Sequence, residues 1–130
     1  APHFGGREAG ALLPARVTGV EADGLTRLQT RAGAVWLAQA LPIGAEVRLR
    51  VRAGDVTLAL ERPQGLSALN ILPGRVVSVL RDAVGPGVMI GLDCQGAALL
   101  ARVTGRSCDA MGLAPGLSIW VVLKALSVVA

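Results

Sequence analysis

Two hydroxyl side chains and one lysine near the carboxyl end of the chain have the types and spacing expected of an anion site. Thr104 and Ser107 lie three positions apart, and Lys124 is the only lysine among 13 basic residues. The pattern predicts a strand that ends near Thr104 and a short helix near 108–112 with Ser107 as its N-cap. Free N–H groups at a helix start carry partial positive charge and, with hydroxyl donors, suit a tetrahedral dianion. The segment therefore predicts a small oxyanion site.

Each of these residues also has a purely structural interpretation. Ser107 could cap its helix while Thr104 fills a strand end, and Lys124 could extend its ammonium into water. A partly buried Lys124 would instead need a carboxylate or a bound anion, because an unpaired buried charge is unfavourable. Arg102 and Arg106, which flank Thr104, are expected to be solvated. Both interpretations stay open on the residues alone.

The rest of the composition argues against catalysis. His3 is the only histidine and lies in a loose N-terminal segment, so neither a histidine triad nor a histidine metal site can be built. No GxxxxGK[ST] phosphate loop occurs, and the nine carboxylates form no evident acid–base pair. We expect a chain that is not an enzyme by itself and that has no metal ligands and no organic cofactor.

Charge and aromatic content narrow the choice of partner. The net charge of +4 and the pI near 10.5 suit an anionic partner. Phe4, Trp36 and Trp120 are the only aromatic residues, too few for the stacking platforms of single-strand binders, so no nucleic acid is expected. Cys94 and Cys108 match no metal or CxxC spacing and are expected to be small buried side chains, which favours a cytoplasmic setting.

The elements that must position these residues are predicted to be short strands. Seventeen glycines and seven prolines separate short runs of valine and leucine, and no apolar run approaches the roughly 18 residues of a membrane span. Strands are expected at these ranges: 12–20, 25–31, 34–38, 46–60, 72–81, 87–93, 97–103 and 117–129. Ser67 is expected to cap a single helical turn, and Asn70 to be a turn or cap residue.

The chain is also an imperfect duplication. Residues 12–17 (LLPARV) match 71–76 (ILPGRV) 59 positions later, and 44–56 align with 116–128 at an offset of 72. The second unit alone has the segment with Thr104 and Ser107. We predict an all-β chain of two tandem OB-like barrels with a short helix in the second. Its predicted parts are an N-terminal arm or the tail of a preceding domain (1–10), a first barrel (11–65) and a second, oxyanion-binding barrel (66–130).

Three separated motifs in the second unit then suggest a family. SALNILPGRV, ARVTGRSCDAMGLAPG and VVLKALSV resemble, in this order, the molybdenum–pterin-binding (Mop) module, also called a TOBE domain. The match covers residues 66–130. The first half resembles the C-terminal regulatory region of the ATP-binding subunit of a molybdate ABC importer more than a molbindin, because molbindins tend to carry the full motif in both halves.

The resemblance implies binding of molybdate or tungstate at an interface between modules of two subunits. By position, the oxyanion-binding residues would be Ser67, Thr104, Ser107, Lys124 and the backbone around Ala125. It further implies a homodimer, contact with membrane permease subunits through the parent ATPase, and a cytoplasmic location peripheral to the inner membrane. In such importers the domain is thought to let cytoplasmic oxyanion inhibit transport.

Two departures from the family pattern keep alternatives open. Leu69 replaces the arginine of the family's SARN signature, and Ala125 replaces a serine that often follows the lysine. Loss of a guanidinium removes a charge-assisted contact. One alternative is therefore a ligand-free module that dimerises a transporter ATPase, and another is a stand-alone molbindin-type molybdate storage protein. A nucleic-acid-binding OB barrel is the least favoured interpretation.

Overall fold

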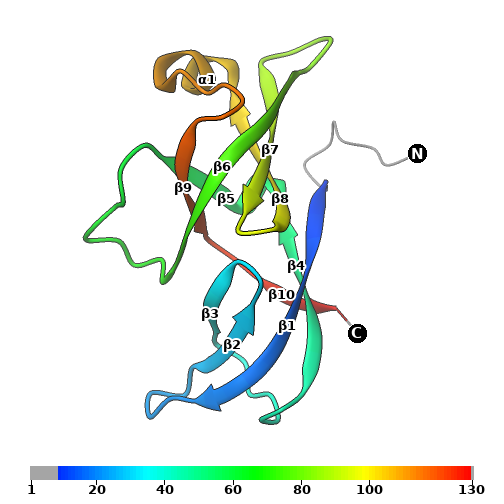
Figure 1. The fold of residues 1–130 in the computed structure, drawn as a ribbon, viewed down its shortest axis with the longest axis vertical. Coiled ribbons are helices and arrows are strands. Elements are labelled where there is room, and N and C mark those ends of the chain that lie inside the picture. Colours follow the sequence, from blue (N-terminus) through cyan, green and yellow to red (C-terminus); the bar gives the residue numbers. More distant parts are fainter. Residues whose placement is uncertain (1–8, 130) are drawn as a thin grey trace.

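The computed structural model describes residues 9–129, which form two five-stranded antiparallel sheets stacked along the long axis of the molecule (Figure 1). The elements of the first sequence repeat are β1 (Gly10–Val20), β2 (Thr26–Thr30), β3 (Gly33–Leu37), β4 (Glu46–Arg52), the 3-10 turn η1 (Ala53–Asp55) and β5 (Val56–Ala59). Those of the second are β6 (Asn70–Arg81), β7 (Gly87–Cys94), β8 (Ala97–Thr104), α1 (Gly105–Met111), β9 (Ser118–Leu123) and β10 (Ser127–Val129). The predicted all-β fold of two OB-like barrels with one short helix is confirmed.

The two repeats exchange their last strands. One sheet has the order β10-β4-β1-β2-β3 and the other β5-β9-β6-β7-β8, so β5 lies in the sheet of the second repeat and β10 in the sheet of the first. The single strands predicted at 46–60 and 117–129 are therefore wrong. Each is broken into two, by Ala53–Asp55 in one case and by 124–126 in the other, and the chain crosses between barrels at the break. The predicted division of the chain into two units, 11–65 and 66–130, stays a prediction.

The duplication extends to individual backbone hydrogen bonds. Val17 N–H donates to a carbonyl in the turn before β4 at 2.9 Å, and Gly44 N–H donates back to Val17 at 2.8 Å. Val76 and Gly116 repeat the arrangement in the second barrel, again at 2.9 and 2.8 Å. A register shift follows Val17 in β1 and Val76 in β6. These bulges bend the first strand of each repeat at the same place.

Alternation of buried and exposed residues explains how the strands pack. In β4 the buried Leu49 and Val51 alternate with the exposed Arg48, Arg50 and Arg52, which is the predicted period of two. The buried side chains of both sheets form one continuous cluster, because the exchanged strands bring residues from each repeat into the other's interior. Within residues 9–129, no helix is long and apolar enough to cross a bilayer.

Both cysteines are buried free thiols, as predicted. Cys94 is at the end of β7 and is fully inaccessible to solvent. Burial, with a smaller contribution from the nearby Asp93 carboxylate, raises the pKa of the Cys94 thiol from 9.0 to about 11. Gly74 of β6 leaves room for it, since a Cβ at that position would stand 3.0 Å from the Cys94 sulfur. The predicted arm lies outside the described residues as far as residue 8, but Gly10 is the first residue of β1.

Candidate functional site

The helix α1 begins at a cap formed by the two predicted hydroxyls. The N-cap is Thr104, whose Oγ1 accepts a hydrogen bond of 3.0 Å from Ser107 N–H. The prediction that Ser107 is the cap is therefore wrong, because Thr104 already has extended backbone and points its oxygen at the third helical residue. Thr104 Oγ1 also donates to Ser107 Oγ at 3.1 Å. In this arrangement the proton of the Ser107 hydroxyl remains available to a ligand, and both residues are exposed.

One ion pair joins α1 to the end of β6, and a second joins β8 to the loop after β6. Arg81, the last residue of β6, donates to Asp109 of α1 at 2.6 Å, and this contact raises the pKa of the guanidinium above its usual value. Arg102 pairs with Asp82, and both side chains are about four-fifths buried, so the prediction that Arg102 is simply solvated is wrong. Gly87 leaves the space for this pair, because a Cβ there would collide with both side chains.

The other three predicted residues lie around the opposite end of β6, and two of them are in the segment where the chain crosses from β9 to β10. Lys124 and Ala125 follow β9, and Ser67 lies in the loop that precedes β6; all three are exposed. The backbone N–H of Lys124 donates to Asp55 O at 2.9 Å, whereas its ammonium makes no ion pair within the described part of the chain. A hydrogen bond thus holds the backbone of Lys124, while its ammonium has no ion-pair partner among the described residues.

The loop that carries Ser67 differs from the prediction. Ser67 forms a bend and caps no helical turn. Asn70 is neither a turn nor a cap residue; it is the first residue of β6, is 8% exposed, and bonds through its side chain to the main chain of Trp36. Leu69, at the position of the family arginine, is 55% exposed. No pattern in the sequence pointed to the Asn70–Trp36 contact, because the partners are 34 positions apart.

Within one subunit the five residues form two groups rather than one site. Thr104 pairs with Gly87 near the end of β6 that carries Arg81, whereas Lys124 follows Leu123, which pairs with Asn70 at the opposite end of β6. The strand has 12 residues, and about 3.3 Å per residue separates its ends by on the order of 30 Å. Figure 1 shows α1 at one extremity of the molecule and the β9–β10 connection between the two barrels.

A groove in the described surface lies apart from both groups. The groove has a volume of about 1000 Å³ and is lined by residues of both barrels, among them Arg16, Arg31 and Arg48 of the first and Gly96 of the second. It includes none of the five predicted residues. No group of three or more histidine, cysteine or acidic side chains that could hold a metal ion occurs between residues 9 and 129. The chemistry available at the two groups is therefore that of hydroxyl, ammonium and backbone N–H donors, which suits an anion.

The fold and these motifs define the class of protein. The family model for the TOBE domain matches residues 66–130, and the chain belongs to this family. Among its relatives is the molybdenum import ATP-binding protein ModC of Mesorhizobium japonicum, with 45% identity over 122 residues that make up 92% of this chain and 33% of that protein. The ModC protein of Rhizobium etli is 39% identical over 93% of this chain and 34% of its own length. The chain thus spans about a third of the length of these relatives.

A solved structure shares the two-barrel fold. The cytoplasmic molybdate-binding protein ModG, crystallised with molybdate bound, superposes with a TM-score of 0.74 at 28% identity, covering 92% of this chain and 96% of that one. The similarity includes both barrels, since it extends over nearly the whole length of each chain.

Proposed function

We propose that this chain is a cytoplasmic oxyanion-binding regulatory region of the ATP-binding subunit of a molybdate ABC importer. The observation that carries the proposal is the 45% identity with a molybdenum import ATP-binding protein over 92% of this chain. The likeness to a protein crystallised with molybdate supports the choice of ligand. Molybdate and tungstate are both tetrahedral dianions, and the proposal includes either.

The position of the donors supports a site shared between two subunits. Thr104 and Ser107 lie at the α1 end of β6, whereas Ser67, Lys124 and Ala125 lie around its other end, beside the β9–β10 crossover and on the order of 30 Å away. One oxyanion is too small to contact both groups of a single subunit. In a homodimer, the α1 end of one subunit would meet the crossover of its partner, and the two groups would together enclose the ligand.

Each donor has a distinct role in this composite site. Lys124 supplies the charge that balances the dianion, and its ammonium forms the strongest contact because both partners are ionised. The free proton of Ser107 and the hydroxyl of Ser67 would donate to oxygen atoms of the ligand, and the N–H of Ala125 would add a backbone donor. Thr104 orients Ser107 through the helix cap.

In the whole assembly this region would lie on the cytoplasmic side of a membrane transporter. The parent subunit would hydrolyse ATP, contact membrane permease subunits and lie peripheral to the inner membrane, while the present chain would have no catalytic role. Binding of cytoplasmic oxyanion at the dimer interface would inhibit transport when the anion is abundant.

Titration calorimetry with molybdate, and with sulfate as the control, tests the proposal. We expect micromolar or tighter binding of molybdate and much weaker binding of sulfate, together with ligand-linked dimerisation in sedimentation. Saturating molybdate that produces neither heat nor a rise in melting temperature would refute it.

Two observations favour other candidates. Leu69 removes a guanidinium that the family uses, which favours a module that dimerises the ATPase without a ligand; its sedimentation would be indifferent to molybdate. The match to ModG along nearly the whole of both chains favours a stand-alone storage protein. For that candidate, the native gene product would lack an ATPase domain.

A further inference from the structure

The buried side chain of Asn70 joins the two barrels. Its Oδ1 accepts a hydrogen bond of 2.8 Å from Trp36 N–H, and its Nδ2 donates at 2.9 Å to Trp36 O. Thr26 and Thr30, the other buried polar residues of the described chain, bond to Gln39 and Gly33 within the first barrel. The side chain of Asn70 therefore bonds to both main-chain polar groups of Trp36, and it links β3 of the first barrel to β6 of the second.

We call the group of Ser67, Lys124 and Ala125 the half-site, and the two loops that carry these residues both adjoin Asn70. Asn70 is the first residue of β6 and pairs with Leu123, the last residue of β9. Ser67 precedes Asn70 by three positions, and Lys124 directly follows Leu123. A displacement of Asn70 would move the origins of both loops together.

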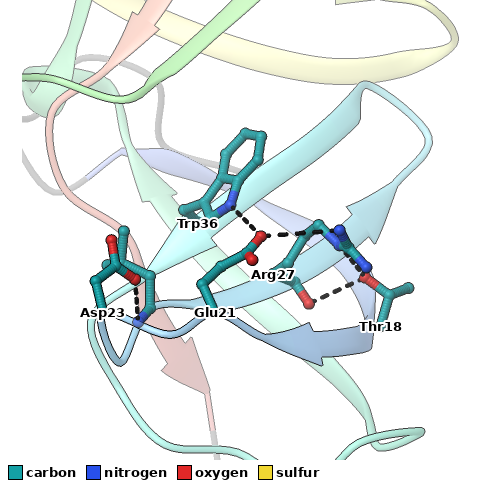
Figure 2. A network of polar contacts seen from close by, with 6 residues as sticks. Thr18, Glu21, Asp23, Arg27 and Trp36 are labelled. Atoms are coloured by element: carbon teal, nitrogen blue, oxygen red, sulfur yellow. Dashed lines mark hydrogen bonds and ion pairs between the residues drawn. The ribbon is translucent and has the colours of Figure 1, made fainter.

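The partner of Asn70 is itself held in place. Trp36 pairs with Arg27 across β2 and β3, and its indole Nε1 donates to Glu21 Oε1 at 3.4 Å (Figure 2). Glu21 in turn lies 3.8 Å from Arg27, which also bonds to Thr18. The amide of Asn70 is thus bonded to Trp36, which is itself held by its pairing with Arg27 and by Glu21. Trp36 belongs to the first barrel, which contributes none of the five predicted ligand residues.

From this geometry we propose that Asn70 is a positioning residue for oxyanion binding. It fixes the loops of Ser67 and Lys124 against the main chain of Trp36, so that the first barrel sets the geometry of a half-site in the second. The inference rests on the proposed function. Donors must be held to within about half an ångström of their productive positions, and a buried amide bonded at both ends supplies that constraint.

The test compares Asn70→Ala with Thr26→Val in molybdate titrations of the full chain. Both variants remove buried hydrogen bonds, but Thr26 bonds to Gln39 within the first barrel, whereas Asn70 bonds from the second barrel to the first. We expect the Kd for molybdate to rise at least tenfold for Asn70→Ala and to change less than twofold for Thr26→Val. If Asn70→Ala does not fold, Asn70→Leu, which is nearly isosteric, takes its place.

The shift of tryptophan emission on addition of saturating molybdate to folded protein supplies a second readout. In a Trp120→Phe background Trp36 is the only tryptophan, and we expect molybdate to shift its emission when Asn70 is present and not in Asn70→Ala. An unchanged Kd in a folded Asn70→Ala protein, or an equal loss in Thr26→Val, would overturn the inference and leave the proposed function standing. No molybdate binding by the unmodified chain would overturn both.

Discussion

The backbone N–H of Lys124 donates a hydrogen bond of 2.9 Å to the carbonyl oxygen of Asp55. Asp55 ends η1 and leads into β5, and Lys124 follows β9 and leads toward β10, so this bond joins the two crossovers at which the barrels exchange strands. The lysine is held by its backbone at the crossover while its side chain is exposed. Its charge can therefore be removed without disturbing the fold.

We expect Lys124→Ala to raise the Kd for molybdate by about ten- to a hundredfold, since a hydrogen bond to a charged group contributes about 1.5–3 kcal/mol. The free energy of unfolding should change by less than about 0.5 kcal/mol, as for other exposed positions. Calorimetry and chemical denaturation measure the two quantities. The control is Arg50→Ala, which also removes one exposed charge, from β4; an equal loss of affinity there would mean that only net charge matters.

Leu69→Arg should strengthen molybdate binding. Leu69 is 55% exposed, so an arginine fits without a change in the core, and its guanidinium restores a charge-assisted donor beside Ser67. We expect a Kd about fivefold or more lower by calorimetry. Leu66→Arg is the matched control, because Leu66 is 48% exposed in the same loop and the substitution adds the same charge. Equal gains in both variants would remove position 69 from the site.

Thr104→Ala should destabilise the protein by about 1 kcal/mol, because the Ser107 N–H loses its cap acceptor. Thr104→Ser keeps the oxygen and should restore most of that stability in thermal melts. Ser107→Ala leaves the cap acceptor in place and should have the smaller effect on melting but the larger effect on molybdate affinity. A Thr104→Ser variant as unstable as Thr104→Ala would contradict the cap assignment.

Stability should fall at high pH because of Cys94. Its thiol is neutral in the folded state up to a pKa of about 11, whereas in the unfolded chain it ionises near 9.0. Between these two pKa values the unfolded state binds fewer protons than the folded state. The stability that the neutral Cys94 thiol contributes is therefore fully present below pH 9 and is lost as the pH rises toward 11. The expected loss is on the order of 2 kcal/mol. Urea denaturation at pH 8 and pH 10.5 measures it, and Cys94→Ala should show a smaller decrease.

The chain's local patterns contained much of the fold. Period-two alternation located β4, the glycine and proline punctuation bounded the hairpins, and the repeated LLPARV and ILPGRV segments indicated two similar units. Cys94 and Cys108 were expected to be buried, and they are. The alternation depends on residues a few positions apart, because one face of a strand must be apolar, and the repeat is a direct match between two segments of the chain.

What the sequence did not contain is which distant segments meet. Nothing in the apolar run of β9 shows that the next strand crosses to the other sheet, because a continuing strand and a crossing strand have the same alternation. The Arg102–Asp82 pair and the Asn70–Trp36 contact likewise join segments separated by 20 and 34 positions.

The site divides in the same way. The sequence by itself predicted the donors, through the types and order of Ser67, Thr104, Ser107 and Lys124, and it indicated the family through three motifs. Only the tertiary structure decided that Thr104 is the cap and that the donors form two groups at opposite ends of β6. The reason is physical: residue types set what a side chain can bind, whereas the distance between side chains far apart in the chain is set by strand pairing and burial across the whole fold.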